Sequence, residues 1–135
     1  MFKYGMRSER CLNTSHKLLR TVFEKALEKQ LIDIAVIFGY RDETEQNNAH
    51  NSGNSKVTFP NSKHNIMPSN AVDAFPVVNG NISYNYYHCC FLAGIVMATA
   101  AELGIKIRWG GNWDQDGEPI TDQTFNDLGH YEIAS

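Results

Sequence analysis

Two histidines and a carboxylate in this chain have the residue types of a catalytic metal site. His64 and Asp73 lie on either side of a short turn, and His130 lies near the C-terminus between Asp127 and Glu132. Neutral imidazole and ionised carboxylate are ligands that zinc accepts at neutral pH. Three such ligands leave the fourth position of a tetrahedral ion free for water, which is the pattern of a catalytic zinc site rather than a structural one. The residue types therefore predict a catalytic zinc site.

Such a site also needs a general base that does not ligate the metal. Asp127 and Glu132 are the two candidates. Alternation along a strand puts Glu132 on the same face as His130, whereas Asp127 precedes the turn-forming Gly129 and can lean over the open position. Spacing alone leaves both candidates open.

The elements that must position these residues include both helices and strands. Apolar spacing, caps and breakers predict helices over 14–29, 42–49 and 84–103, the last with Gly104 at its C-cap. Apolar and alternating segments predict strands over 32–38, 71–78, 105–109 and 130–133, with a polar loop over 51–63 and an acid-rich loop over 110–124. Mixed elements with hairpin-like loops favour an α+β fold with a small antiparallel sheet and flanking helices.

Alternation also predicts where the carboxylate of Asp73 points. In a strand over 71–78, Asp73 faces opposite Val72 and Ala74. If those two residues face the core, Asp73 faces a groove, and the preceding turn can fold His64 back beside it. His130 must then reach the same point from a neighbouring strand. The alternative is structural, with Asp73 a buried hydrogen-bonding carboxylate and His130 an exposed strand residue.

The composition limits the class of protein. A chain of 135 residues that is 42% apolar fits one domain, residues 1–135, with a single core. Its net charge of −3 excludes a broad basic field, so we expect no nucleic-acid partner and no anionic membrane surface. The N-terminus lacks the apolar segment of a secretory signal, and the longest apolar stretch, 91–101, is too short to span a bilayer. We expect cytoplasmic synthesis, no membrane insertion and a monomer.

The cysteines do not suggest a metal site. Cys11, Cys89 and Cys90 are odd in number and show no CxxC spacing, so a thiolate zinc site is not expected. We interpret them as buried free thiols of a protein made in a reducing compartment.

The acid-rich loop resembles a fragment of a calcium-binding loop. Asp114, Asp116 and Glu118 alternate there, but the segment lacks the full length and the distal bidentate glutamate of an EF-hand. We interpret it as an acidic turn, with calcium binding as the lesser alternative.

These residues resemble the zinc peptidases of the LAS group, which includes lysostaphin, D-Ala-D-Ala peptidases and hedgehog-type domains. The group's first motif, S-x-H-x-x-G-x-A-x-D, is similar to Ser62-Lys63-His64 followed by Ala71-Val72-Asp73. Here the interval is two residues longer, and Pro68-Ser69 stands where the glycine is expected. The second motif, an acid three residues before a histidine, matches Asp127 and His130.

Further segments extend the resemblance over nearly the whole chain. Ser8 to Leu18 is similar to the family's first helix, Gly39-Tyr40-Arg41 followed by Gln46 to its G-x-R…Q segment, and Gly110 to Asp114 to its G-G-x-W loop. The most similar members are phage L-alanyl-D-glutamate endopeptidases, which are endolysins. The resemblance implies one catalytic domain of the hedgehog/DD-peptidase type, with no separate wall-binding domain.

The resemblance also implies roles for individual residues. His64, Asp73 and His130 become the zinc ligands, Asp127 the base, and Glu132 a partner that orients a ligand. Arg41 is expected to stabilise the oxyanion together with zinc; its alternative is a surface residue paired with Asp42 or Glu43. The remaining residues expected near the groove are Ser62, Gln46, Trp113 and Tyr131, of which the two aromatics have a core position as their alternative.

The implied substrate is the stem peptide of peptidoglycan, cut between L-Ala and D-Glu during lysis of the host cell. One alternative is a D-Ala-D-Ala carboxypeptidase or dipeptidase with the same site, and another is a zinc-holding binding module without catalysis. The absence of a signal implies synthesis in the host cytoplasm and action on the wall after release.

Overall fold

An antiparallel sheet forms the middle of the molecule, and the computed structural model describes residues 1–134. Its strands run in the order β1-β2-β5-β4, so the last strand of the chain lies between β2 and β4. A short strand, β3, pairs with β2 through a hairpin. The strands are β1 (Asp33–Phe38), β2 (Ala71–Val78), β3 (Asn81–Ile82), β4 (Ile107–Gly110) and β5 (Asp127–Ile133).

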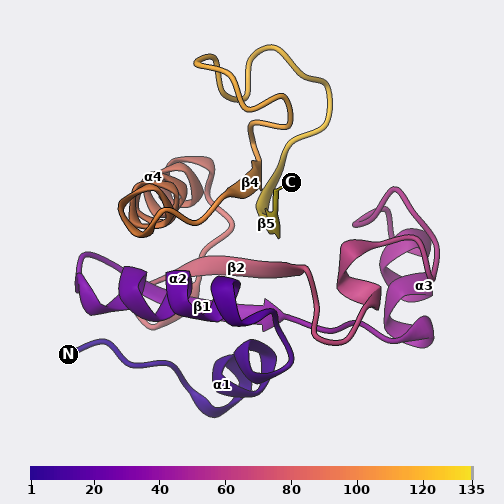
Figure 1. Ribbon diagram of the computed structural model, residues 1–135, viewed down its shortest axis with the longest axis horizontal. Helices are drawn as coiled ribbons and strands as arrows, with labels where there is room; N and C mark the ends of the chain where they lie inside the picture. Colours follow the sequence, from indigo (N-terminus) through magenta and orange to yellow (C-terminus); the bar gives the residue numbers. More distant parts are fainter. Residues whose placement is uncertain (135) are drawn as a thin grey trace.

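Four α-helices and one turn of 3₁₀-helix surround the sheet (Figure 1). The long α4 packs on α2 and on β2, β4 and β5, while α3 lies beyond the C-terminal end of β1, away from α4 (Figure 1). The helices are α1 (Met6–Asn13), α2 (Lys17–Glu28), α3 (Glu43–Asn51), η1 (Lys63–Asn65) and α4 (Tyr86–Leu103). The predicted α+β class with an antiparallel sheet and flanking helices is confirmed.

The core lies between the sheet and the helices α2 and α4 and is built from alternate strand residues. Val72 and Ala74 of β2 are buried there, as strand alternation predicts. Tyr131 of β5 is fully buried, and its ring meets Phe23 edge-on at 5.3 Å. The predicted groove position of Tyr131 is therefore wrong, and its core alternative is confirmed. Because side chains alternate along β5, Tyr131 points away from the face that carries His130.

Two element boundaries differ from the prediction for identifiable reasons. The helix expected over 14–29 begins only at Lys17, because His16 caps α2 by accepting a hydrogen bond from the amide of Leu18 (3.0 Å). Ser15, just before this cap, bridges to Ser69. The strand expected from residue 105 starts at Ile107, because the amide of Ile105 still bonds to the Ala100 carbonyl of α4 (2.9 Å).

By length and composition alone, α4 could cross a membrane. It is longer than the apolar stretch 91–101, which is too short to do so. Core helices pass the same test, and its inner residues Leu92, Ala93 and Val96 belong to the core. The three cysteines are free, as expected, but only Cys89 is fully buried.

Candidate metal centre

Asp73 and His130 are brought together by the register of two neighbouring strands. They are direct partners in the antiparallel pairing of β2 with β5, and His130 Nδ1 lies 3.5 Å from Asp73 Oδ1. Because Val72 and Ala74 face the core, Asp73 faces the opposite side of the sheet, as alternation predicted. The backbone pairing alone therefore places a carboxylate beside an imidazole.

His64 reaches the same carboxylate from η1. Its amide donates to the hydroxyl of Ser62 (3.1 Å), which caps this short helix, and its carbonyl accepts from the amide of Arg41 (2.8 Å). The imidazole is buried, with Nε2 at 3.1 Å from Asp73 Oδ1. Ser62 thus contributes by holding His64 in place.

The hydrogen bonds of the two imidazoles leave one nitrogen of each directed at Asp73. His64 Nδ1 donates to the Gly39 carbonyl (2.8 Å), and His130 Nε2 donates to Glu132 Oε1 (2.8 Å). The neutral form of each ring therefore has a free lone pair, on His64 Nε2 and on His130 Nδ1. One ligand atom from each of His64, Asp73 and His130 lies within 4.8 Å of the others. This donor set fits a zinc ion.

Gly39 is needed for the hydrogen bond that orients His64. A side chain there would collide with the Cys11 carbonyl and with the hydroxyls of Thr14 and Ser15. Only glycine lets β1 approach α1 so closely, and this approach carries the Gly39 carbonyl to the imidazole.

Glu132 orients the His130 ring by accepting its Nε2 hydrogen bond. Its second oxygen accepts from Arg108 Nη2 (2.7 Å), its strand partner on β4, and pairs with Lys63 Nζ (3.0 Å). Although burial raises the pKa of Glu132, hydrogen bonds from His130, Lys63 and Arg108 lower it to about 2. Glu132 is therefore ionised and fully engaged. The sequence reasoning missed Arg108 and Lys63; strand pairing was the only signal for the first.

Asp127 has the opposite electrostatic character. Burial, and then the charge of Asp73, raise its pKa to about 6. Its Oδ2 lies 4.0 Å from His130 Nδ1, and its side chain is 31% exposed. A carboxylate whose pKa lies near neutrality can take up and return a proton, so the electrostatics favour Asp127 over Glu132 as the base.

The charges of Asp73 and His130 support each other. Burial opposes ionisation of Asp73, but His64 and His130 hold its pKa well below the usual range. Burial likewise lowers the pKa of His130, but Asp73 and Glu132 raise it to about 9. Without a metal, His130 therefore carries a proton at neutral pH, and a metal ion would have to displace it.

Arg41 is buried against Asp73 rather than paired at the surface with Asp42 or Glu43, so that alternative is wrong. Its Nη2 donates to Asp73 Oδ2 (2.6 Å), and its Nη1 donates to Gln46 Oε1 (3.0 Å). Gln46 is itself fully buried and donates to the Val57 carbonyl (2.8 Å). Arg41 and Gln46 together fix the carboxylate that both histidines approach.

Two hollows flank this centre, and both are lined by Arg41 and Asp127. The first, here called the basic groove, has a volume of about 270 Å³, and its lining includes Lys56, Lys63, Trp113 and Phe125. The second, here called the aromatic groove, has a volume of about 640 Å³ and includes Phe38, Glu45, Phe75 and Tyr84.

Trp113 forms one wall of the basic groove, in agreement with its predicted position. Its indole donates to the Phe125 carbonyl (2.9 Å), and its ring stacks on Phe125 at 6.4 Å. The same ring lies 5.5 Å from that of His130. The groove therefore begins directly beside a candidate ligand.

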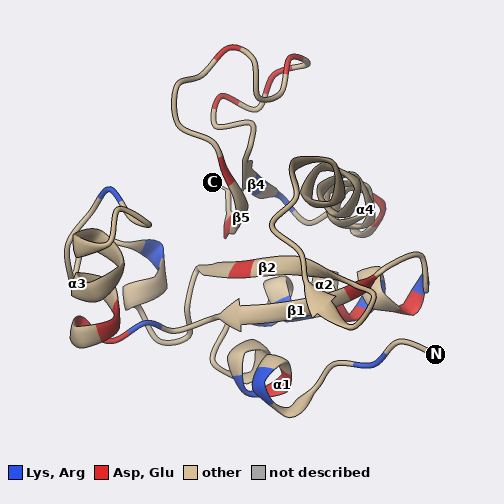
Figure 2. Cartoon of the chain, turned by 180° about the vertical axis from the view of Figure 1, so that it is seen from behind, with Lys and Arg blue, Asp and Glu red and all other residues tan. Residues whose placement is uncertain are grey.

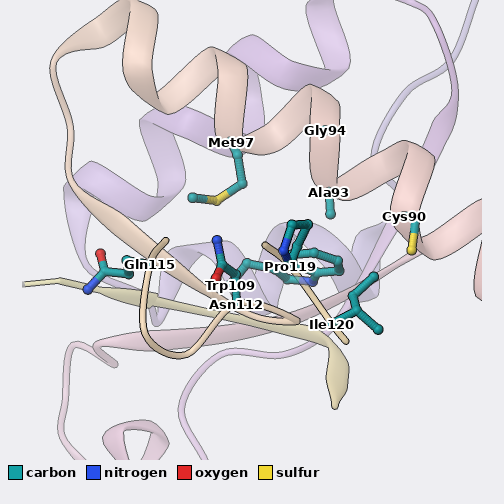
Figure 3. A pocket seen from close by; sticks show the side chains of 9 residues that line it. All are labelled: Cys90, Ala93, Gly94, Met97, Trp109, Asn112, Gln115, Pro119 and Ile120. Carbon is teal, nitrogen blue, oxygen red and sulfur yellow. The ribbon is translucent and has the colours of Figure 1, made fainter. Parts of the chain in front are cut away.

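A third hollow, of about 510 Å³, lies between α4 and the loop that follows β4 (Figure 3). Its lining includes Met97, Trp109 and Ile120, and its one titratable side chain is Cys90, whose pKa is raised by burial. No residue of the candidate centre lines it, so this hollow is separate from the two grooves.

The acid-rich loop places its carboxylates differently from the prediction. Asp114 and Asp116 lie close to Asp122, and all three are exposed, whereas Glu118 does not belong to the group. Exposed acidic groups are common on proteins without an ion, so this geometry by itself carries no calcium proposal.

Comparisons with known proteins identify the family of this chain and agree with its fold. The model of the phage L-alanyl-D-glutamate peptidase family matches residues 1–134. The L-alanyl-D-glutamate peptidase of Escherichia phage T5 is 32% identical over 137 residues, which cover 98% of each chain. Among solved structures, the L-Ala D-Glu endopeptidase ChiX of Serratia marcescens aligns with a TM-score of 0.77 and 27% identity over 98% of this chain and 90% of its own.

A more distant structural neighbour is the vancomycin-resistance D,D-dipeptidase VanXYg, solved with a D-Ala-D-Ala phosphinate analogue. It aligns with a TM-score of 0.51 and 17% identity over 88% of this chain and 50% of its own. At this identity the likeness concerns the fold alone. It confirms the predicted hedgehog/DD-peptidase type of architecture.

Proposed function

Since the chain belongs to the phage L-alanyl-D-glutamate peptidase family, we propose that it is a zinc-dependent peptidoglycan hydrolase that cuts the stem peptide between L-Ala and D-Glu. The observation that carries the proposal is the convergence of His64 Nε2 and His130 Nδ1 on one oxygen of Asp73. These three side chains would hold the ion. A zinc ion held there would lower the pKa of a water molecule to about 7 and would polarise the scissile carbonyl.

In this mechanism Asp127 is the residue that moves the proton. It accepts a proton from the attacking water, and the protonated carboxyl then gives it to the nitrogen of the leaving amine. In the metal-free chain, burial and the charge of Asp73 raise the pKa of Asp127 to about 6, so this carboxyl can release and take up a proton near neutral pH. General base catalysis of this kind typically contributes about 10²–10⁴-fold.

We assign Arg41 to positioning Asp73 first and to charge stabilisation second. One guanidinium nitrogen donates to Asp73 and another donates to Gln46, while Nε has no partner among the described residues. Arg41 lines both grooves, so developing charge on the carbonyl oxygen lies within its field. Trp113 shapes the basic groove.

The two alternative functions differ from this proposal at identifiable points. A D-Ala-D-Ala peptidase would share the centre, but the family model and the relative from phage T5 support the L-Ala–D-Glu bond. A non-catalytic zinc module has no need of a carboxyl with the raised pKa of Asp127. We further propose that the enzyme acts on the wall after its release from the host cytoplasm.

The test combines metal analysis with product identification. The purified chain should contain about one zinc per molecule and should release new L-Ala ends on the sugar-linked product from peptidoglycan, detected by mass spectrometry. Asp127→Asn should keep the zinc and lose about 10²–10⁴-fold in turnover. Release of free D-Ala would support the D-Ala-D-Ala alternative, and full turnover by Asp127→Asn would exclude this residue as the base.

A further inference from the structure

The two grooves beside the metal centre differ in charge, and this difference bears on how the substrate lies. The lining of the basic groove includes the lysines Lys56 and Lys63. In the aromatic groove the charged group beyond the centre is a carboxylate, Glu45. Figure 2 shows two basic segments beside α3, on the loop before η1 and on η1 itself, toward β5. A ligand with unevenly distributed charge would therefore prefer one direction across the site.

Lys56 is the cation of the basic groove that is available to a ligand. Arg41 is engaged by Asp73 and Lys63 by Glu132. Within residues 1–134 the ammonium of Lys56 pairs with no carboxylate and lies over the Phe125 ring, 4.8 Å from its centroid. Phe125 stacks on Trp113, which in turn touches His130. A continuous aromatic wall thus leads from the candidate ligand to Lys56.

The aromatic groove offers a surface for a neutral ligand. Phe75 and Tyr84 meet there with ring centroids 4.7 Å apart. The Phe75 ring is fixed against the backbone of Gly129, where any side chain would collide with it. Tyr84 remains 66% exposed. Exposed rings beside a groove suit the apolar faces of sugars and small aliphatic groups.

The proposed substrate has matching asymmetry. On the acyl side of the L-Ala–D-Glu bond lie a methyl side chain, a lactyl ether and a sugar, all uncharged. The free carboxylates lie on the amine side: the α-carboxylate of D-Glu, which continues the peptide through its side chain, and the distal carboxylate of a diaminopimelate third residue. The negative charge of the substrate is therefore confined to one half.

We propose that the amine half of the stem peptide lies in the basic groove, where Lys56 pairs with one of its carboxylates, and that the acyl half lies in the aromatic groove. This inference rests on the proposed function. It makes Lys56 a specificity-determining residue, which distinguishes free from amidated stem peptides. Such an exposed ion pair changes affinity by up to about fivefold and weakens with added salt.

The experiment uses four synthetic substrates that share the acyl half. The D-Glu α-carboxyl is either free or amidated, and the third residue is either diaminopimelate or lysine. The wild type should show a higher kcat/KM, by about fivefold, on the substrate with the recognised carboxylate. Preference lost on amidation identifies the α-carboxylate, and preference lost with lysine identifies the distal one. Equal kcat/KM on all four substrates overturns the proposal.

Variants at Lys56 separate recognition from a structural role. Lys56→Met should lose the preference while cleaving the substrate without that carboxylate at the wild-type rate, and Lys56→Glu should reverse it. Lys106→Met, which removes an exposed lysine that lines neither groove, should behave as wild type. An equal loss on all four substrates with Lys56→Met would mean a structural role and overturn the proposal.

A separate experiment tests the placement of the acyl half in the aromatic groove. Tyr84→Leu should lower kcat/KM only on substrates that carry the muramyl sugar, and not on N-acetyl-L-Ala analogues. A wild type that cleaves none of these substrates would refute the proposed function itself. Cleavage without any charge preference would refute only the assignment of the grooves.

Discussion

Two ligands of the candidate centre come from strands, and the third comes from η1 in the connection between α3 and β2, here called the loop side. The two sides are held in different ways. Asp73 and His130 are partners in the β2–β5 pairing, so their proximity follows from backbone register. His64 depends on single hydrogen bonds, from the Ser62 cap to the Gly39 carbonyl. The strand side is therefore built into the sheet, whereas the loop side is assembled from local contacts.

The largest effect should come from removing an imidazole on either side. His130→Ala and His64→Ala each leave two protein ligands, so both should lose stoichiometric zinc and all measurable hydrolysis. Elemental analysis of the purified variants and a dye-release assay on wall material measure the two properties. Full zinc retention by His64→Ala would mean that the loop side does not take part in the centre.

The next largest effect should come from Glu132, which orients His130 on the strand side. Glu132→Ala removes the acceptor that orients His130 and should weaken zinc binding by about 10–100-fold. Glu132→Gln keeps an acceptor oxygen and should recover part of this loss. Competition with a fluorescent chelator gives the affinities. If both variants bound zinc as tightly as the wild type, strand register alone would suffice to hold His130.

A pH series tests whether zinc binding displaces a proton from His130 on the strand side. The pKa of His130 in the metal-free chain is raised to about 9, so the ring is protonated at lower pH and must lose that proton on binding. Apparent zinc affinity should therefore rise with pH by about tenfold per unit over roughly pH 6–8. Calorimetry in buffers of different ionisation enthalpy measures the released proton. A binding heat independent of the buffer would contradict the prediction.

The smallest effect should come from the cap on the loop side. Ser62→Ala removes the side-chain acceptor of η1 and should cost about 1 kcal/mol of local stability. If all of this cost appears in metal binding, zinc affinity falls by about fivefold. Ser62→Thr keeps the hydroxyl and serves as the matched control. A larger loss from Ser62→Ala than from Glu132→Ala would reverse the ranking of the two sides.

Local patterns in the chain were enough to predict much of this site. Strand alternation predicted that Asp73 faces away from the core, and the buried Val72 and Ala74 confirm it. The same rule placed Glu132 on the face of His130, and the two side chains form a hydrogen bond. The same alternation places Tyr131, between His130 and Glu132, on the core face. The predicted groove position of Tyr131 did not take this into account.

What the sequence determined by itself is the set of ligand types and the face from which each strand residue points, because alternation is a property of consecutive residues. Other features depend on the folded chain: β5 lies beside β2, Arg41 turns inward to Asp73, and Arg108 and Lys63 both pair with Glu132. These contacts join residues far apart in the chain. Their geometry follows from strand order and register, which the spacing of residues does not record.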